Sequence, residues 1–304
     1  MASGGVVPEK PRHRSGYGQD ELEQVKAACL TVAVTLGAYL DDVCIVGGLV
    51  PALLIDARRH NAGDEDIHPG TNDLDIGLAL ALLDEQRYAE IADRLRAEGF
   101  EADTNKADRP TLQRWRMGAL KVTIDFLMEP PSSQDRPGSV QPLQPDFGVL
   151  LTPGVELALE ERILVELDGH TLSGERVSRA VPVCGPAAFV VLKALAFGDR
   201  AEPKDAYDLV YVIRNTDGRG DAIAQGLARH AERHVDMVQR ALALLARDFD
   251  APDGLGPGRA ADFMLTDERD RDADAADAHG FVDDLLRAAR REGLSFSSID
   301  AGSR

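Results

Sequence analysis

The sequence is poor in aromatic residues, and it contains no long apolar run. Phe, Trp and Tyr together make up 5% of the 304 residues. No apolar stretch approaches the ~20 residues that a helix needs to cross a bilayer, so we expect no membrane-spanning segment. Hydrophobic residues still make up 44% of the chain. That is enough for the buried core of one large domain or two moderate ones.

Cysteine is scarce as well. The three cysteines, Cys29, Cys44 and Cys184, are isolated in apolar surroundings. Their arrangement predicts neither a disulfide framework nor a zinc site, and it is typical of buried thiols in a reducing compartment such as the cytoplasm. Residues 1–19 are rich in Gly, Pro and charge and lack the apolar segment of a secretory signal. We expect them to form a disordered tail.

Basic residues are outnumbered by acidic ones, 34 to 52, which gives a formal net charge of −18. This balance argues against a general nucleic-acid coat protein, because phosphate binding needs clustered Lys and Arg. It does not exclude RNA as a substrate, since a local basic patch can coexist with an acidic remainder. An acidic chain also suits a basic protein partner.

Apolar periodicity divides the chain into two parts. Strand-like alternation and amphipathic helical segments alternate over residues 20–184, whereas helical spacing dominates over 185–304. We therefore predict an α+β protein with a mixed-sheet core domain followed by a helical C-terminal domain. Interruptions are expected at a loop or flap over 130–145, a Pro/Gly loop over 251–258 and a mobile acidic segment over 267–277.

A Gly-Gly turn and a pair of alternating carboxylates carry the first functional signal. A short apolar strand ends at Gly47-Gly48, at the start of a helix expected to run to His60. Glycines at such a turn let backbone N–H groups approach a phosphate. Asp73 and Asp75 alternate on a later strand and therefore share a face. Mg²⁺ is held by one or two carboxylates together with substrate phosphates, so this pair is a candidate metal site.

A third carboxylate, Asp125, lies in a strand that is otherwise rich in apolar residues. A charge in such a strand needs a partner or a metal. The alternative is a surface-facing aspartate on an edge strand. Arg114 and Arg116 alternate on the preceding strand, so they too share a face.

One polar loop carries four further potential ligands, His60, Asp64, Asp66 and His68. Their spacing matches no strong metal-binding motif, which favours a solvated loop.

Lys193 interrupts a strongly apolar helical run over 187–197. Its ammonium group either reaches solvent along its apolar stem or meets an anion. Its replacement is expected to weaken nucleotide transfer without unfolding the protein. On the next predicted helix, Lys204 and Asp208 are four residues apart and therefore neighbours. A simple helix ion pair explains that spacing without any function.

Taken together, these motifs resemble those of the DNA polymerase β-like nucleotidyltransferases, whose signature is a Gly-Gly or Gly-Ser turn, then Asp-x-Asp, then a later strand carboxylate. Within them the chain resembles the AbiEii/AbiGii toxin family, to which the MenT toxins are related. The gap between the Gly-Gly turn and Asp-x-Asp is longer than the family pattern. The resemblance covers about residues 40–215 and rests on Gly47-Gly48, Asp73-x-Asp75, residues 124–126, Lys193 and residues 204–209.

The resemblance implies a polymerase β-like mixed sheet flanked by helices. It also implies metal-dependent transfer of a nucleotide from a nucleoside triphosphate to RNA, with the tRNA 3′ end as favoured acceptor, by the toxin of a toxin–antitoxin or phage-defence system. The implied ligands of Mg²⁺, or of Mn²⁺, are Asp73, Asp75 and Asp125. The implied nucleotide-binding residues are Gly47, Gly48, Lys193 and Lys204. Asp208, or alternatively Asp205, would position Lys193, and Asp125 would also help to activate the acceptor hydroxyl.

Three alternatives stay open. A small-molecule nucleotidyltransferase, such as an antibiotic-modifying enzyme, would use the same residues. A non-catalytic nucleotide-binding relative would keep the fold, although the intact carboxylates argue against it. A partner-docking protein would depend on the helical C-terminal part instead. A cognate antitoxin is the expected protein partner of a toxin.

Overall fold

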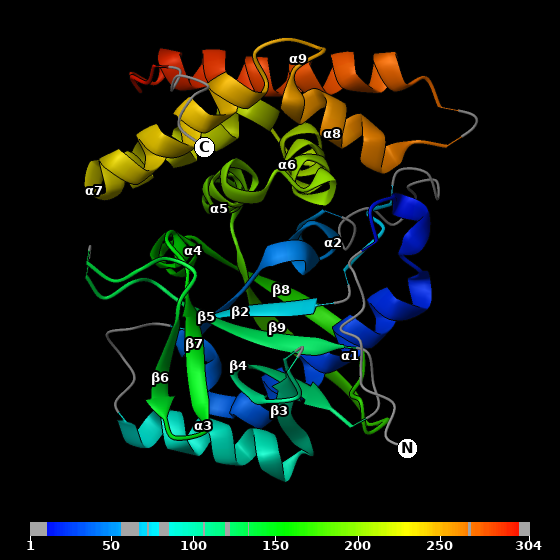
Figure 1. Ribbon diagram of the computed structural model, residues 1–304, viewed down its shortest axis with the longest axis vertical. Helices are drawn as coiled ribbons and strands as arrows, with labels where there is room; N and C mark the ends of the chain where they lie inside the picture. The colour runs from blue at the N-terminus through cyan, green and yellow to red at the C-terminus, as the bar shows by residue number, and fades with distance from the viewer. Residues whose placement is uncertain are drawn as a thin grey trace. The chain divides into compact units, whose positions relative to one another are not determined.

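The computed structural model describes residues 11–55, 67–71, 73–78, 85–105, 107–118, 122–132, 134–266 and 269–297. Contacts divide the chain into two compact units. We call residues 17–50 and 69–184 the sheet unit, and residues 11–16, 51–68 and 185–304 the helical unit. The fold is α+β, with a mixed sheet and helices followed by a helical C-terminal part, which confirms the expected fold class (Figure 1).

Nine strands of the described chain form a single mixed sheet. They are β1 (Val43–Val46), β2 (Asp73–Leu78), β3 (Phe100–Thr104), β4 (Pro110–Met117), β5 (Thr123–Met128), β6 (Val140–Gln144), β7 (Phe147–Leu151), β8 (Arg162–His170) and β9 (Arg176–Cys184). Their order is β3-β4-β5-β2-β1-β9-β8, and β7 pairs with β5 and β6. The pairs β2–β5, β1–β9 and β5–β7 are parallel, and the other pairs are antiparallel.

Among the described residues of the sheet unit, the α-helices are α1 (Gln19–Leu36), α3 (Glu85–Ala97) and α4 (Val155–Glu160). The parallel register of β2 and β5 pairs Ile76 with Phe126, so these two buried side chains share one face of the sheet. Phe126 packs on Phe147, which in turn contacts the ring of Tyr88 from α3. This face therefore carries the apolar core beneath α3.

The opposite face of β2 carries Asp73, Asp75 and Gly77. A Cβ atom added at Gly77 would lie 2.9 Å from a methyl group of Val155, so α4 packs directly against this face. The short α4 covers Gly77 near the end of β2. The two aspartates lie earlier on the strand, where they are only partly buried.

The helical unit contains five long helices of the described chain: α5 (Pro186–Arg200), α6 (Pro203–Asn215), α7 (Arg219–Asp248), α8 (Leu255–Met264) and α9 (Arg271–Arg291). Proline opens both α5 and α6, where its missing N–H and fixed φ suit the first helical turn. Between these two helices Ala201 adopts φ +52°, which reverses the chain and sets α6 beside α5.

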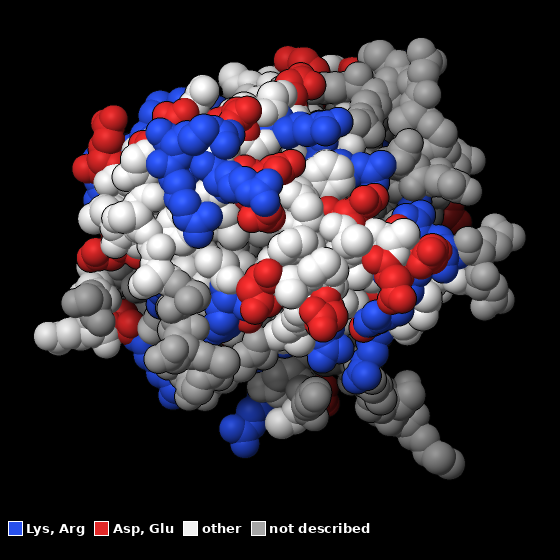
Figure 2. Space-filling model, turned by 90° about the horizontal axis from the view of Figure 1, so that it is seen from above, with Lys and Arg blue, Asp and Glu red and all other residues white. Residues whose placement is uncertain are grey.

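Acidic and basic side chains lie next to one another on the surface shown in Figure 2, where one group of basic residues is bordered by acidic ones. On α9, Arg287 pairs with Asp283 and Asp284, and Arg291 pairs with Asp221 of α7. No helix among the described residues combines the length and apolar character needed to span a bilayer.

Three expectations about loops are wrong. The segment expected as a loop over 130–145 contributes β6, which forms a hairpin with β7. Helix α8 begins at Leu255, within the expected Pro/Gly loop. Residues 271–277 of the acidic segment that was expected to be mobile are helical, because α9 begins at Arg271, and residues 267 and 268 lie outside the described residues.

The start of α9 explains how an acidic run becomes helical. The side chain of Asp270 accepts hydrogen bonds from the backbone N–H groups of Asp272 and Ala273, at 3.1 and 3.2 Å. Asp272 and Asp274 then occupy the first turn, where the positive end of the helix dipole favours negative charge. The helix expected after the Gly-Gly turn is described as α2 (Val50–Leu54), and residues 56–60 lie outside the described residues.

Candidate active site

Three aspartates meet on the polar face of β2 and β5. Parallel register pairs Asp73 with Thr123 and Asp75 with Asp125. The hydroxyl of Thr123 donates a hydrogen bond to Oδ1 of Asp73 at 2.8 Å. Because paired residues of adjacent strands point to the same side, all three carboxylates share one face. We call Asp73, Asp75 and Asp125 the carboxylate cluster.

Gly47 lies directly against this cluster. Its φ is +71°, and a Cβ atom added there would lie 1.9 Å from Oδ2 of Asp75. The register of β1 and β2, which pairs Val46 with Asp75, places the turn at this carboxylate. Gly48 is buried in the same short 3-10 turn, Gly47–Leu49. Glycine at position 47 therefore has a structural reason, since any side chain would collide with Asp75.

Arg114 is the cationic partner of Asp125. Its Nε donates to both carboxylate oxygens at 2.9 and 3.1 Å, and its Nη2 donates to Oδ2 at 2.6 Å. Asp125 is 7% exposed and lies on β5, between β2 and β4, so it is not an exposed residue of an edge strand. The sequence predicted only that Arg114 and Arg116 share a face of their strand, and the antiparallel register of β4 and β5 places Arg114 opposite Asp125.

All three carboxylates act on the same guanidinium. The hydrogen bond to Asp125 raises the pKa of Arg114, burial opposes that change, and the charges of Asp73 and Asp75 raise the pKa further. Three carboxylates and one guanidinium leave an excess of negative charge among these four side chains. Oxygen ligands of this kind suit a hard divalent cation such as Mg²⁺, so the donor set fits the metal that the sequence motif predicts.

A second group of charges lies between α5 and α6. The ammonium group of Lys193 donates to Oδ1 of Asp205 at 2.8 Å and to Oδ2 of Asp208 at 2.7 Å. The exposed fractions of these residues are 7%, 3% and 0%. Lys193 therefore meets two anions instead of reaching solvent. Lys204 donates to both oxygens of Asp208, at 2.8 and 2.9 Å. We call Lys193, Lys204, Asp205 and Asp208 the lysine–aspartate cluster.

Arg200 completes the neutralisation of Asp205. Its Nε donates to Oδ2 at 2.5 Å and its Nη2 to Oδ1 at 2.9 Å. Its guanidinium is more exposed than the rest of the group, with 55% of the side chain accessible. Asp205 is thus held from one side by a buried ammonium and from the other by a half-exposed guanidinium.

Burial and charge pairing compete in the lysine–aspartate cluster. Burial lowers the pKa of Lys193, but Asp205 and Asp208 outweigh it, so the pKa lies above its usual value. Burial raises the pKa of Asp205, but Lys193 and Arg200 bring it down to about 2. The pKa of Asp208 is also lowered by the two lysines, against the effect of burial. For Lys204 burial prevails over Asp208, and its pKa is lowered.

His68 joins this cluster, so for this one residue the expectation of a solvated loop is wrong. It is fully buried, and its Nε2 lies 2.8 Å from Oδ1 of Asp208. The other three residues of the predicted loop, His60, Asp64 and Asp66, lie outside the described residues. Nothing in the local sequence pattern indicated this contact, because its two residues are 140 positions apart.

The chain matches the family model described as "Nucleotidyl transferase AbiEii toxin, Type IV TA system" over residues 70–297. No curated protein matches it. The matched range includes β2, β5 and all of α5–α9, so it extends well beyond residue 215, where the sequence resemblance stops, and it begins after the Gly-Gly turn. Since three quarters of the chain are matched, the protein belongs to the AbiEii family of nucleotidyltransferase toxins of type IV toxin–antitoxin systems.

Proposed function

We propose that this nucleotidyltransferase toxin transfers a nucleotide from a nucleoside triphosphate to an RNA acceptor, with the tRNA 3′ end favoured. The observation that carries the proposal is the carboxylate cluster, in which Asp73, Asp75 and Asp125 share one face and act on one cation. Such a cluster suits a reaction in which negatively charged phosphates must be brought to a metal.

In this proposal the carboxylate cluster holds one or two Mg²⁺ ions, with Mn²⁺ as the alternative. A divalent ion supplies stabilisation of the attacking oxygen and of the leaving pyrophosphate. The protein's contribution is to orient the ligands. Thr123 fixes Asp73 through its hydroxyl, Gly47 leaves room for Asp75, and Arg114 holds Asp125. Asp125 is also proposed to help activate the acceptor hydroxyl.

Lys193 is proposed to neutralise the β- or γ-phosphate of the nucleotide. An ammonium group has three N–H donors, and Asp205 and Asp208 take two of those of Lys193. A third donor is left for a substrate oxygen. Because the pKa of Lys193 is raised, the group stays charged at neutral pH. Lys204, Gly47 and Gly48 are proposed to bind the same triphosphate.

A cognate antitoxin is the proposed protein partner, and the net charge of −18 suits a basic one. The nucleoside triphosphate and the tRNA acceptor are both cytoplasmic molecules, and we propose that the toxin acts there.

The test is incorporation of label from each of the four α-labelled ribonucleoside triphosphates, in the presence of Mg²⁺ or Mn²⁺. Total tRNA and an aminoglycoside serve as parallel acceptors. We expect label in tRNA, and its loss in Asp73→Asn. Asp168→Asn, which changes an exposed aspartate on β8, is the matched control and should retain activity. Labelled aminoglycoside without labelled RNA would instead establish a small-molecule enzyme.

A further inference from the structure

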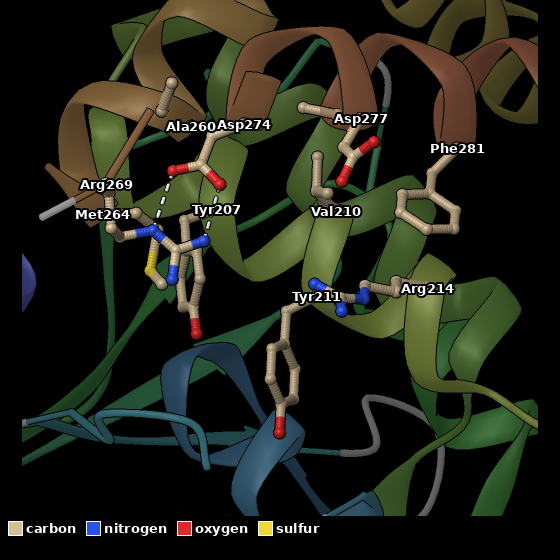
Figure 3. A pocket seen from close by; sticks show the side chains of 12 residues that line it. Tyr207, Val210, Tyr211, Arg214, Ala260, Met264, Arg269, Asp274, Asp277 and Phe281 are labelled. Atoms are coloured by element: carbon tan, nitrogen blue, oxygen red, sulfur yellow. Dashed lines mark hydrogen bonds and ion pairs between the residues drawn. The ribbon is translucent and has the colours of Figure 1, made fainter. Parts of the chain in front are cut away.

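His68 is packed against aromatic residues of the helical unit. Its ring stacks on Tyr207 with centroids 5.4 Å apart, and it meets the edge of Tyr211 at 5.0 Å. Figure 3 shows the rings of Tyr207 and Tyr211 side by side below α6, with both hydroxyl groups pointing away from α9. Tyr207 is itself packed on Phe263 of α8, at 4.9 Å. The rings of Tyr207 and Tyr211 therefore restrict the orientation of the His68 imidazole, and we call this pair of rings the aromatic slot.

The protonation of His68 fixes the direction of its hydrogen bond. Burial lowers the pKa of His68 to about 4, so the ring is neutral at neutral pH. Asp208 is ionised and can only accept, because its pKa is lowered by the two lysines in spite of burial. Nε2 of His68 must therefore carry the ring proton and donate it to Oδ1 of Asp208, at 2.8 Å.

The two oxygens of Asp208 have different partners. Oδ1 accepts from His68, whereas Oδ2 accepts from Lys193 at 2.7 Å. Lys204 lies between the two oxygens, at 2.8 and 2.9 Å, and so cannot distinguish one rotation of the carboxylate from another. The rigid imidazole does favour one rotation. If the carboxylate turned away from His68, Oδ1 would lose the imidazole and Oδ2 would also move away from Lys193.

We propose that His68 is a positioning residue of the nucleotide site: it fixes the rotation of the Asp208 carboxylate and thereby aims the Lys193 ammonium at the triphosphate. The inference rests on the proposed role of Lys193 and adds the residue on which the direction of its ammonium depends. The aromatic slot of Tyr207 and Tyr211 gives His68 the rigidity that this role requires.

Two variants separate the hydrogen bond of His68 from its ring. His68→Phe keeps an aromatic ring between the tyrosines but loses the donor. His68→Gln loses the ring but carries an N–H donor at about the reach of Nε2. His279→Gln is the control, since His279 belongs to the same unit and contacts the backbone oxygen of Phe249 instead of the cluster.

The measurement is the affinity of the full-length protein for the four ribonucleoside triphosphates and the corresponding monophosphates, by calorimetry with Mg²⁺. His68→Phe should weaken triphosphate binding about tenfold, the scale of one charge-assisted hydrogen bond. It should leave monophosphate binding nearly unchanged, because Lys193 is assigned to the β- or γ-phosphate. His68→Gln should restore triphosphate affinity to within roughly threefold, on the same scale. A general structural defect would weaken both kinds of nucleotide alike.

Three results would overturn the proposal: unchanged triphosphate binding in His68→Phe, equal losses for triphosphate and monophosphate, or no rescue by His68→Gln. Lys193→Met is measured in parallel. If Lys193→Met binds triphosphate like the wild type, the proposed function of Lys193 fails. If Lys193→Met binds triphosphate weakly while His68→Phe binds it with wild-type affinity, only the role of His68 is refuted. If His68→Phe does not fold, the proposal is tested by comparing the triphosphate affinities of His68→Gln and His68→Asn. The shorter amide of Asn cannot reach Asp208, so His68→Asn should bind triphosphate more weakly than His68→Gln.

Discussion

The carboxylate cluster and the lysine–aspartate cluster manage charge in opposite ways. Asp73 and Asp75 are partly exposed on a strand, and they share one guanidinium with Asp125. The lysine–aspartate cluster is buried, and its two carboxylates are met by two ammonium groups and Arg200. The first group is rich in negative charge, whereas the second supplies its own counter-ions.

Because of this difference, substitutions in the two clusters should affect different properties of the protein, catalysis in one and folding stability as well in the other. In the proposed function, the carboxylate cluster is completed by a metal ion that binds after folding, so changes in this cluster should affect catalysis more than folding. A buried network with its own partners is formed when the chain folds, and removing one member leaves another charge buried and unpaired. Changes in the lysine–aspartate cluster should therefore affect both transfer and stability.

The largest effect is expected at Asp75. Asp75→Asn keeps the shape of the side chain but removes a charge that the proposed metal ion would need, and metal stabilisation of a transition state is worth several kcal/mol. Nucleotide incorporation should fall about a thousandfold. The melting temperature without metal should stay the same or rise, since one of three like charges is removed. Asp75→Asn with more than a tenth of wild-type incorporation would remove Asp75 from the proposed metal site.

Replacing Lys193 should lower both folding stability and nucleotide transfer, in contrast to the replacement of Asp75. Lys193→Met keeps the apolar stem but leaves Asp205 and Asp208 without their shared ammonium. Breaking a buried pair from one side costs about 3–5 kcal/mol, and transfer should drop roughly tenfold to a hundredfold. The expectation that losing this lysine spares the fold is therefore revised. Urea unfolding provides the measurement, and wild-type stability in Lys193→Met would contradict the pairing.

A compensating change tests whether the unpaired carboxylate causes that loss. Adding Asp205→Asn to Lys193→Met removes one of the two stranded charges, so part of the lost stability should return. Nucleotide transfer should not return, because the proposed phosphate ligand is still missing. If the double variant is less stable than Lys193→Met, Asp205 contributes to the fold in some way other than through Lys193.

Local patterns predicted the first cluster better than the second. Alternation on β2 and β5 placed Asp73, Asp75 and Asp125 on strands, and parallel pairing then brought these strands together. The same alternation placed Arg114 and Arg116 on one face of their strand, but only the register of β4 and β5 shows that Arg114 is opposite Asp125. Such signals work because the period of a strand determines the direction of each side chain.

Contacts between distant segments could not be predicted in this way. His68 and Asp208 are 140 positions apart, and no periodicity links a residue before β2 to the middle of α6. The hairpin of β6 and β7 was missed because Pro142 lies within β6, where proline usually argues against a strand. The start of α9 was missed because its acidic run reads as self-repelling until the capping of Asp270 is known.

The pH dependence of stability provides a test confined to the second cluster. His68 has a pKa of about 4 in the folded protein, against 6.5 for an exposed histidine. The unfolded chain then binds more protons over this interval, so the free energy of unfolding should decrease as pH falls from 6.5 to 4. The decrease due to His68 is roughly 3 kcal/mol.

Among the described residues, the groups near His68 include Asp208, Lys193, Lys204, Tyr207 and Tyr211. The pKa of Asp208 is lowered in the folded protein. Asp208 therefore contributes its full stabilisation above its unfolded pKa near 3.8, and this contribution is lost only at pH values below the interval from 6.5 to 4. Urea unfolding of wild type and His68→Gln at several pH values isolates the histidine from other titrating groups. Parallel curves for the two proteins would show that His68 is not buried in its neutral form.

The smallest effect is expected at Arg114, the guanidinium on which the three aspartates of the carboxylate cluster act. Arg114→Gln removes the guanidinium that all three carboxylates share, so the metal-free protein should lose about 1–2 kcal/mol of stability, on the scale of a partly exposed ion pair. If Mg²⁺ binds the folded state as proposed, it should raise the melting temperature more than in the wild type, because Arg114 no longer competes for Asp125. Arg116→Gln is the matched control, because Arg116 lies on the same face of β4 but pairs with Glu101 and Asp103. Equal responses to Mg²⁺ in the two variants would mean that Arg114 does not substitute for the metal charge, and the contrast between the two clusters would lose its main support.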